Sequence, residues 1–454
     1  MGLGSGLGVY LPIVVYLACI FGTVISAARP QVGIYLLALI LPLSHARGRL
    51  FEYPFGSHAI EILLLGVLIG VVARGENPLP QVRGRNTLLV MAITSYISLW
   101  IGPVLNSAVP WPITMGESPF ARWILYMRMP AIFVLTYLAI NTKRKMEILL
   151  LCMLVSFLWV GKGFRTTMGA RDVSQSFSNN LRSGAGLGFG GSNGMAAFQL
   201  GSAAFLIGIF GADKRWRIRI PIVAAIAMGV YGILFSYSRG AYVGFALVLC
   251  YVSFFKMRWL VPVLLILALN AQWVLPQSVK DRISMTYKEG EGEEELESSA
   301  GDRLEIWVHA LQTTMRDPLL GVGFDTYRYY RQDEALRDAH NMYLRALVDT
   351  GVVGLGLLVM FWLTGLKAGH ELFRIADDPL FKGIGFGFAG HMIGLMAANM
   401  FGDRWTYIEL CGPTVLLMGM VMRAHALLRQ PEQAAKVIVP RPQRMASPMP
   451  QPAR

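Results

Sequence analysis

The sequence predicts an all-α polytopic membrane protein. Of its 454 residues, 54% are hydrophobic and only 15% are charged, whereas a soluble globular domain carries roughly 25% charged residues. The hydrophobic residues fall in blocks separated by short basic or polar stretches. A helix needs about 20 such residues to cross the hydrocarbon core, so most of the chain is expected to form a helix bundle in a lipid bilayer.

The apolar blocks are the candidate membrane helices. They cover residues 9–28, 31–44, 59–73, 87–105, 123–140, 146–161, 194–211, 220–236, 241–255, 259–275, 346–366, 383–401 and 407–422. These are 13 candidate spans, although the short second block could instead form part of a hairpin with the first. No basic stretch precedes the first block and no clear cleavage site follows it, so this block is expected to stay in the membrane.

We interpret the net charge of +13 as a consequence of how the chain is oriented in the membrane. The expected partners are therefore membrane lipids and not nucleic acid. Lys and Arg cluster in alternate connectors, at residues 74–85, 143–145, 214–219 and 256–258. The positive-inside rule places such connectors in the cytoplasm. The four cysteines lie in apolar blocks without metal-type spacing, so they are expected to be core thiols. No metal and no cofactor are expected.

This orientation divides the chain into four parts. Residues 1–275 form an N-terminal transmembrane bundle, 276–345 a large outer loop, 346–423 the C-terminal transmembrane helices, and 424–454 a cytoplasmic tail that is expected to be disordered. A connection of about 70 residues is too long for a passive turn. Residues 302–316 carry apolar side chains at helical spacing, which predicts an amphipathic helix within the loop.

A Ser-Arg-Gly motif stands at the outer end of the block 220–236. An arginine at this depth is costly in lipid, so Arg239, after Ser238, is expected to face a protein cavity or an anion. Its guanidinium could bind phosphate oxygens through two parallel hydrogen bonds. The alternative is that Arg239 reaches the membrane surface as an anchor.

Two weaker signals add further arginines. Arg303 opens the predicted loop helix with Trp307 one turn later, although Arg303 could instead pair with Asp302 or Glu305 on a solvated face. Arg182 precedes a glycine-rich segment whose backbone could form a nest for an anion. No P-loop lysine accompanies those glycines, so an ordinary nucleotide site is not predicted.

His340 and Asn341 stand at the end of the outer loop, just before the next membrane helix. The positive end of a helix dipole favours a neutral imidazole, which can accept a proton. Histidine is also the most frequent general base in enzymes. His340 is therefore a candidate catalytic residue. The acidic run at residues 289–297 lacks the calcium-loop pattern and is expected to be a solvated segment.

Taken in order, these motifs resemble the O-antigen ligase and polymerase superfamily. They are Ser-Arg-Gly at 238–240, Gly-Asp-Arg-Leu-Glu-Ile-Trp at 301–307, Asp-Pro-Leu-Leu-Gly-Val-Gly-Phe at 317–324, and Ala-His-Asn-Met-Tyr-Leu at 339–344 followed by Gly-Val-Val-Gly at 351–354. The resemblance implies a GT-C-like fold with about 12 transmembrane helices in the bacterial inner membrane, which agrees within one with the 13 candidate spans. Residues 276–345 would form a large periplasmic loop, and the active site would face the periplasm. It also implies an undecaprenyl-pyrophosphate-linked glycan donor.

The resemblance also implies roles for individual residues. Arg239 and Arg303 would hold the pyrophosphate, Arg182 would assist them, and His340 would be catalytic. Fixed guanidinium groups could stabilise the leaving group without a metal, while His340 takes the proton of the acceptor hydroxyl in a single displacement with inversion. Three further residues are expected to support the site: Ser238, Trp307 and Asn341.

The expected activity is that of an O-antigen ligase acting on a lipid A-core acceptor. Two alternatives share almost the same chemistry, namely an O-antigen polymerase and a protein O-oligosaccharyltransferase. A transporter or flippase would also tolerate buried arginines, but internal repeats would favour that class. The two halves of the chain show no convincing repeat, so transport is the less favoured alternative.

Overall fold

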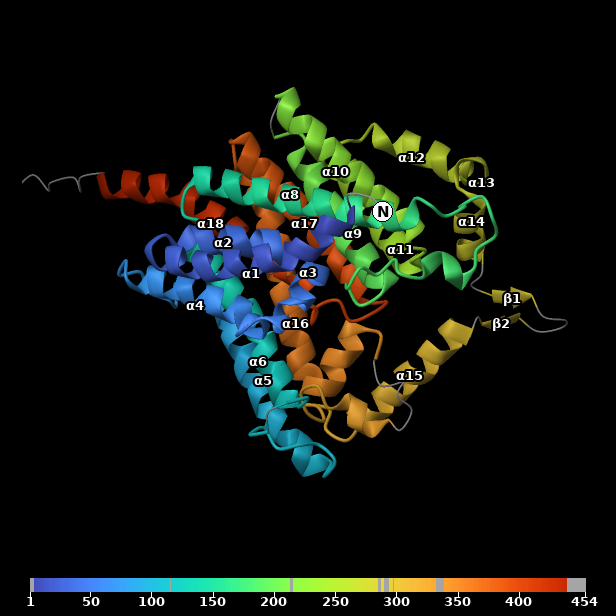
Figure 1. Ribbon diagram of the computed structural model, residues 1–454, viewed down its shortest axis with the longest axis horizontal. Helices are drawn as coiled ribbons and strands as arrows, with labels where there is room; N and C mark the ends of the chain where they lie inside the picture. The colour runs from blue at the N-terminus through green and yellow to red at the C-terminus, as the bar shows by residue number, and fades with distance from the viewer. Residues whose placement is uncertain are drawn as a thin grey trace, which may run out of the picture.

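The computed structural model describes residues 4–114, 116–212, 215–284, 287–289, 294–296, 298–331 and 339–438, and nearly all regular structure in them is helical (Figure 1). The helices of the first half are α1 (Gly4–Ala28), α2 (Pro30–Ile40), α3 (Ser44–Gly48), η1 (Leu50–Glu52), η2 (Gly56–His58), α4 (Ala59–Val72), α5 (Arg85–Leu105), α6 (Pro119–Tyr126), α7 (Arg128–Ala139), α8 (Lys143–Met168), η3 (Asn179–Arg182) and α9 (Ser192–Ile209). Those of the second half are α10 (Trp216–Phe235), α11 (Arg239–Phe255), α12 (Leu260–Leu269), α13 (Ala271–Val274), α14 (Gln277–Ser284), α15 (Ser298–Thr314), η4 (Tyr327–Tyr330), α16 (Met342–Ile375), α17 (Pro379–Asn399) and α18 (Ile408–Ile438).

Six of the described helices are long and apolar enough to cross a membrane: α5, α8, α10, α16, α17 and α18. This confirms the prediction of a multi-pass all-α membrane protein. Shorter apolar helices occur at Pro12–Ala28, Pro30–Ile40, Gly56–Val72, Arg239–Phe255 and Leu260–Leu269. All five overlap blocks predicted to span, and their crossing of the membrane stays a prediction.

The predicted helix at 123–140 is divided into α6 and α7. The division falls beside Arg128, whose Nε atom donates to Glu61 Oε1 at 2.6 Å. A paired charge at this position is more favourable near the membrane surface than in the hydrocarbon core. The predicted single span 123–140 is thus two helices, which meet at Met127.

The centre of the bundle is formed by α17 and α18. In their most apolar windows, 78% of α17 and 83% of α18 is buried, compared with 28% of α10. Helix α17 packs closely on α9, because a Cβ atom on Gly208 would lie only 2.2 Å from the Cα atom of Gly387. Small residues allow the backbones of membrane helices to approach in this way.

The basic connectors meet at one end of the bundle. Arg83, before α5, contacts Glu371 near the end of α16 at 2.5 Å, and Lys143 at the start of α8 contacts Asp378 before α17. Connectors that are distant in sequence therefore lie at the same end of the bundle. This agrees with the prediction that they lie on the same side of the membrane. We refer to it as the basic end.

The last helix extends beyond its predicted boundary. Residues 424–438, predicted as part of a disordered tail, continue α18. His425 explains part of this extension, because its Nε2 atom lies 2.7 Å from the carbonyl oxygen of Ala368 on α16. The rest of the predicted tail, residues 439–454, lies outside the described residues.

Part of the acidic run pairs as a short antiparallel ribbon between β1 (Tyr287–Glu289) and β2 (Glu294–Leu296). Figure 1 shows this ribbon at the edge of the molecule, between α14 and α15. The other residues of 289–297 lie outside the described part of the chain. The predicted amphipathic helix of the loop is present as α15.

Candidate functional site

The Ser-Arg-Gly motif begins α11 after a strained turn. Tyr237 has a φ of +54°, a left-handed conformation that is unfavourable for a tyrosine. It is fully buried, its hydroxyl donates to Ser278 Oγ at 3.1 Å, and its carbonyl oxygen accepts from Arg282 Nε at 3.3 Å. These contacts from α14 hold the turn, and with it the positions of Ser238 and Arg239.

The glycine of the motif has a steric role. A Cβ atom on Gly240 would lie 2.7 Å from the ring of Phe401, which follows α17. A larger side chain would therefore push α11 away from the end of α17. This close approach forms one wall of a small cleft.

That cleft lies between the start of α9, the start of α11 and the end of α17. It is lined by Asn193, Ala197, Ser238, Gly240, Ala241, Ala398, Phe401 and Arg404. Ser238 is 6% exposed and Arg404 8% exposed, so both polar residues are largely removed from solvent. Asn193, on the first turn of α9, thus lies in the same cleft as Ser238.

Arg182 is held against the first turn of α9. Its Nη2 atom donates to Ser192 Oγ at 2.7 Å and to Asn193 Oδ1 at 3.0 Å. Its Nε atom also donates to Ser192 Oγ at 3.1 Å. The guanidinium group is therefore fixed in position beside the cleft.

Three other arginines lie close enough to Arg182 to change its protonation equilibrium. Burial, followed by the positive charges of Arg282, Arg303 and Arg239, lowers the pKa of Arg182 to about 10. Arg182 lies in η3, Arg239 in α11, Arg282 in α14 and Arg303 in α15. We call Arg182, Arg239, Arg282 and Arg303 the arginine cluster. Like charges in a partly desolvated site repel, so this arrangement favours binding of an anion.

Helix α15 also positions the segment before His340. Trp307 Nε1 donates to the carbonyl oxygen of Ala339 at 3.2 Å. Asn341 caps α16, because its Oδ1 atom accepts from the backbone N–H groups of Tyr343 and Leu344 at 2.9 and 3.2 Å. Between these two anchors, His340 has a φ of +47° and is partly buried.

Trp307 lies one turn after Arg303 on α15. The same helix thus carries one arginine of the cluster and the contact that holds the residue before His340. These contacts are what the structure shows for Trp307 and Asn341, and the supporting roles predicted for them stay predictions. Whether His340 acts as a base stays a prediction.

The two glycine motifs of the loop and of α16 dock on each other. The chain at 318–322 bonds to a kink in α16: Val322 N donates to Val348 O at 2.8 Å and Val352 N donates to Pro318 O at 2.9 Å. Gly351, at the kink, has a φ of +66°, and a Cβ atom there would lie 2.1 Å from Leu319 O. The loop therefore supplies a donor, Val322 N, and an acceptor, Pro318 O, to backbone groups of α16 beside the kink.

A buried network of charged side chains holds the outer loop against the start of α16. Arg345, on the first turns of α16, contacts Asp325 at 2.5 Å and Asp349 at 3.5 Å, and also contacts Asp403. The Asp403 side chain is fully buried and that of Asp325 is 5% exposed. The network joins the outer loop, α16 and the turn after α17 into one unit.

Sequence reasoning missed Arg282, Arg404 and this network. The signal for Arg404 was present, since Asp403-Arg404 stands between two apolar blocks. Arg282 lies in an ordinary polar stretch and carries no such signal. Within the described residues, no group of three or more His, Cys, Asp or Glu side chains could hold a metal ion, and the expectation that none is required stays a prediction.

A family model described as O-antigen ligase matches residues 223–359. The matched range contains Arg239, Arg303 and His340, whereas Arg182 precedes it. No curated protein matches the chain.

Proposed function

We propose that this chain, which the match over residues 223–359 assigns to the O-antigen ligase family, transfers a glycan from undecaprenyl pyrophosphate to a lipid A-core acceptor. The family match supports a membrane enzyme of the O-antigen ligase or polymerase type. The donor, the acceptor and the mechanism are our proposal. The observation that carries it is the arginine cluster.

The arginine cluster suits a pyrophosphate leaving group. Three other guanidinium groups lie near enough to lower the pKa of Arg182, and Arg182 itself is fixed by hydrogen bonds to Ser192 and Asn193. Arginine binds phosphate oxygens through paired, charge-assisted hydrogen bonds. Charge develops on the pyrophosphate as its bond to the sugar breaks, and fixed positive groups stabilise that charge without reorganisation.

His340 completes the proposed mechanism. The hydroxyl oxygen of the acceptor attacks the anomeric carbon of the first sugar, while the bond from that carbon to the pyrophosphate oxygen breaks. The imidazole of His340 accepts the hydroxyl proton, and undecaprenyl pyrophosphate leaves with the bonding electron pair. A single displacement inverts the anomeric configuration. Trp307 and Asn341 act as positioning residues for His340.

The same proposal places the protein in the bacterial inner membrane with a GT-C-like fold. The shorter apolar helices, such as α4 and α11, would cross the bilayer together with the six long ones, giving about 12 spans. Residues 276–345 would lie in the periplasm, and the basic end in the cytoplasm. This arrangement puts the arginine cluster and His340 on the periplasmic side.

The test uses a bacterium that lacks its own ligase and makes O-antigen. Expression of the chain should restore a ladder of polymer on lipid A-core, whereas His340→Ala and Arg239→Ala should reduce it at least about 100-fold, the range expected for loss of a general base or of a charge-stabilising group. Arg217→Ala, at the basic end, is the matched control and should behave like the parent. Membrane levels of each variant are measured by immunoblot.

Two outcomes would overturn the proposal. Normal ladders in both variants would remove the assigned site, and retention of the anomeric configuration in the product would exclude the single displacement. Polymer that stays on the polyprenyl carrier would favour the polymerase instead. Polymer attached to protein would favour the protein O-oligosaccharyltransferase.

A further inference from the structure

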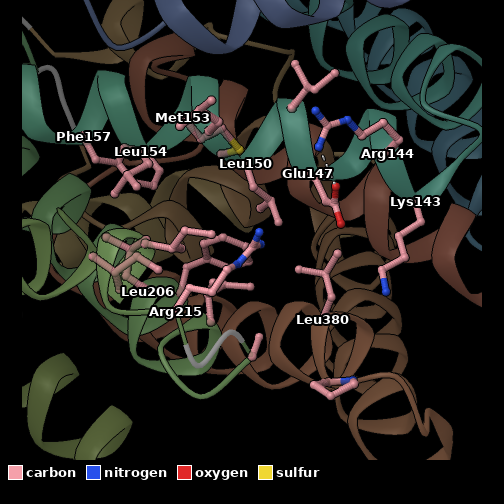
Figure 2. Close-up of a pocket in the computed structure, with 18 of the residues that line it drawn as sticks. Lys143, Arg144, Glu147, Leu150, Met153, Leu154, Phe157, Leu206, Arg215 and Leu380 are labelled. Carbon is pink, nitrogen blue, oxygen red and sulfur yellow. Dashed lines mark hydrogen bonds and ion pairs between the residues drawn. The ribbon is translucent and has the colours of Figure 1, made fainter. Parts of the chain in front are cut away.

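A second site-like feature lies at the basic end of the bundle. A cavity of about 640 Å³ opens between α8, α9, α10 and the start of α17 (Figure 2). This volume falls within the roughly 300–1,000 Å³ of typical small-molecule sites. The proposed glycan-transfer site does not use this cavity.

The cavity is separate from the arginine cluster. Asn193, at the start of α9, bonds to Arg182, whereas Leu206 and Ile209, at the end of α9, line the cavity. At 1.5 Å per residue, roughly 24 Å of helix lies between Asn193 and Ile209. The two features therefore stand at opposite ends of the same helix.

The inner walls of the cavity are apolar. Leu150, Met153, Leu154 and Phe157 of α8 face Leu206 and its neighbours, as Figure 2 shows. Leu151, which also lines the cavity, is 59% exposed on the outside of the bundle. In a membrane that surface would meet hydrocarbon, so an acyl chain could enter from the side.

The mouth of the cavity carries charge. Lys143 contacts Asp378, and Arg144 contacts Glu147 at 3.1 Å. Arg215 extends into the cavity from the opposite side (Figure 2). The mouth thus holds three cationic and two anionic side chains, with a net positive charge that complements a phosphate group.

We propose that this cavity binds an anionic phospholipid of the surrounding membrane, with an acyl chain between α8 and α9 and the phosphate at Lys143, Arg144 and Arg215. Apolar walls below a cationic mouth match the two parts of such a lipid. Basic pockets between membrane helices bind anionic headgroups in this manner. The bound lipid would fill a space that the side chains of α8, α9 and α10 leave open.

The test is native mass spectrometry of the full-length protein titrated with phosphatidylglycerol in detergent. Arg215→Ala should weaken binding about fivefold, the factor that corresponds to the ~1 kcal/mol per basic residue near an anionic headgroup. Leu150→Trp, which fills the cavity, should abolish retention of the tightest lipid. The controls are Arg217→Ala and Val155→Trp, since neither residue lines the cavity.

Equal phosphatidylglycerol affinity in the parent, Arg215→Ala and Leu150→Trp would overturn the proposal. Equal affinity of the parent for phosphatidylcholine would also overturn it, because the charge of the mouth would then play no part. Displacement by undecaprenyl phosphate at equal concentration would assign the cavity to the carrier lipid instead. Arg215 is exposed, so its variant should fold even if Leu150→Trp does not. The readout does not depend on glycan transfer.

Discussion

Arg345→Met tests whether the buried charge network holds the outer loop on the bundle. Methionine keeps much of the length of the side chain and the helix propensity of arginine, but removes the charge. Arg345 contacts three carboxylates, those of Asp325, Asp349 and Asp403. Their side chains are 5%, 6% and 0% exposed, so solvent cannot replace the lost guanidinium.

The expected loss of folding free energy depends on which other partners each carboxylate keeps in the variant. Asp403 still accepts from the backbone N–H groups of Trp405 and Thr406, and Asp325 keeps Arg122 at 3.2 Å. Breaking a buried ion pair costs about 3–5 kcal/mol. Because two of the three carboxylates keep other partners, we expect a loss near the lower limit, about 3 kcal/mol.

The assay is reversible unfolding in mixed micelles with increasing dodecyl sulfate, followed by tryptophan fluorescence. Arg122→Met is the matched control: it removes a different partner of Asp325, but the Arg122 side chain is 50% exposed. Exposed ion pairs contribute about 0–1 kcal/mol. If Arg345→Met lowers the free energy of unfolding no more than Arg122→Met does, the network is not the main interaction that holds the outer loop on the bundle.

Trp307→Phe should lower kcat for glycan transfer about threefold to tenfold with little change in KM, because the net value of a hydrogen bond is about 0.5–1.5 kcal/mol. Initial rates with purified enzyme measure this effect. An unchanged kcat would contradict the prediction. Gly351→Ala should reduce stability by more than about 2 kcal/mol, since the added Cβ would lie 2.1 Å from Leu319 O at a φ of +66°. Gly301→Ala, where a Cβ meets nothing within 4 Å, should leave the melting temperature unchanged or higher. Burial, followed by nearby arginines, lowers the pKa of His309 below its ordinary value, so its stability contribution is present above about pH 6.5 and is lost as the pH falls below that value. His309→Gln should therefore reduce the drop in melting temperature between about pH 7.5 and about pH 5.5, and an identical drop would contradict the assignment.

The fold class could be predicted from sequence because lipid imposes a strict rule. Backbone groups inside a bilayer must form their hydrogen bonds within the segment, so long apolar blocks become helices. Helices α5, α8, α10, α16 and α17 each overlap a predicted block. The boundaries were less predictable: the contacts Arg128–Glu61 and His425–Ala368 join residues far apart in sequence.

For the candidate site too, one part could be predicted from the sequence and another part could not. The motifs around Arg239, Arg303 and His340 could be recognised in sequence, because each is a short local pattern in a fixed order. Their mutual placement could not, since it depends on Arg282 holding Tyr237 and on Trp307 holding Ala339.

The sequence by itself determined the membrane class, the basic connectors, the loop helix and the identity of the motifs, because hydropathy and local spacing depend only on neighbouring residues. The tertiary structure alone decided which arginines gather around Arg182, how the loop docks on the kink at Gly351, and where the cavity at the basic end opens. Each of these depends on side chains brought together from helices far apart in the chain, by packing that no local pattern encodes.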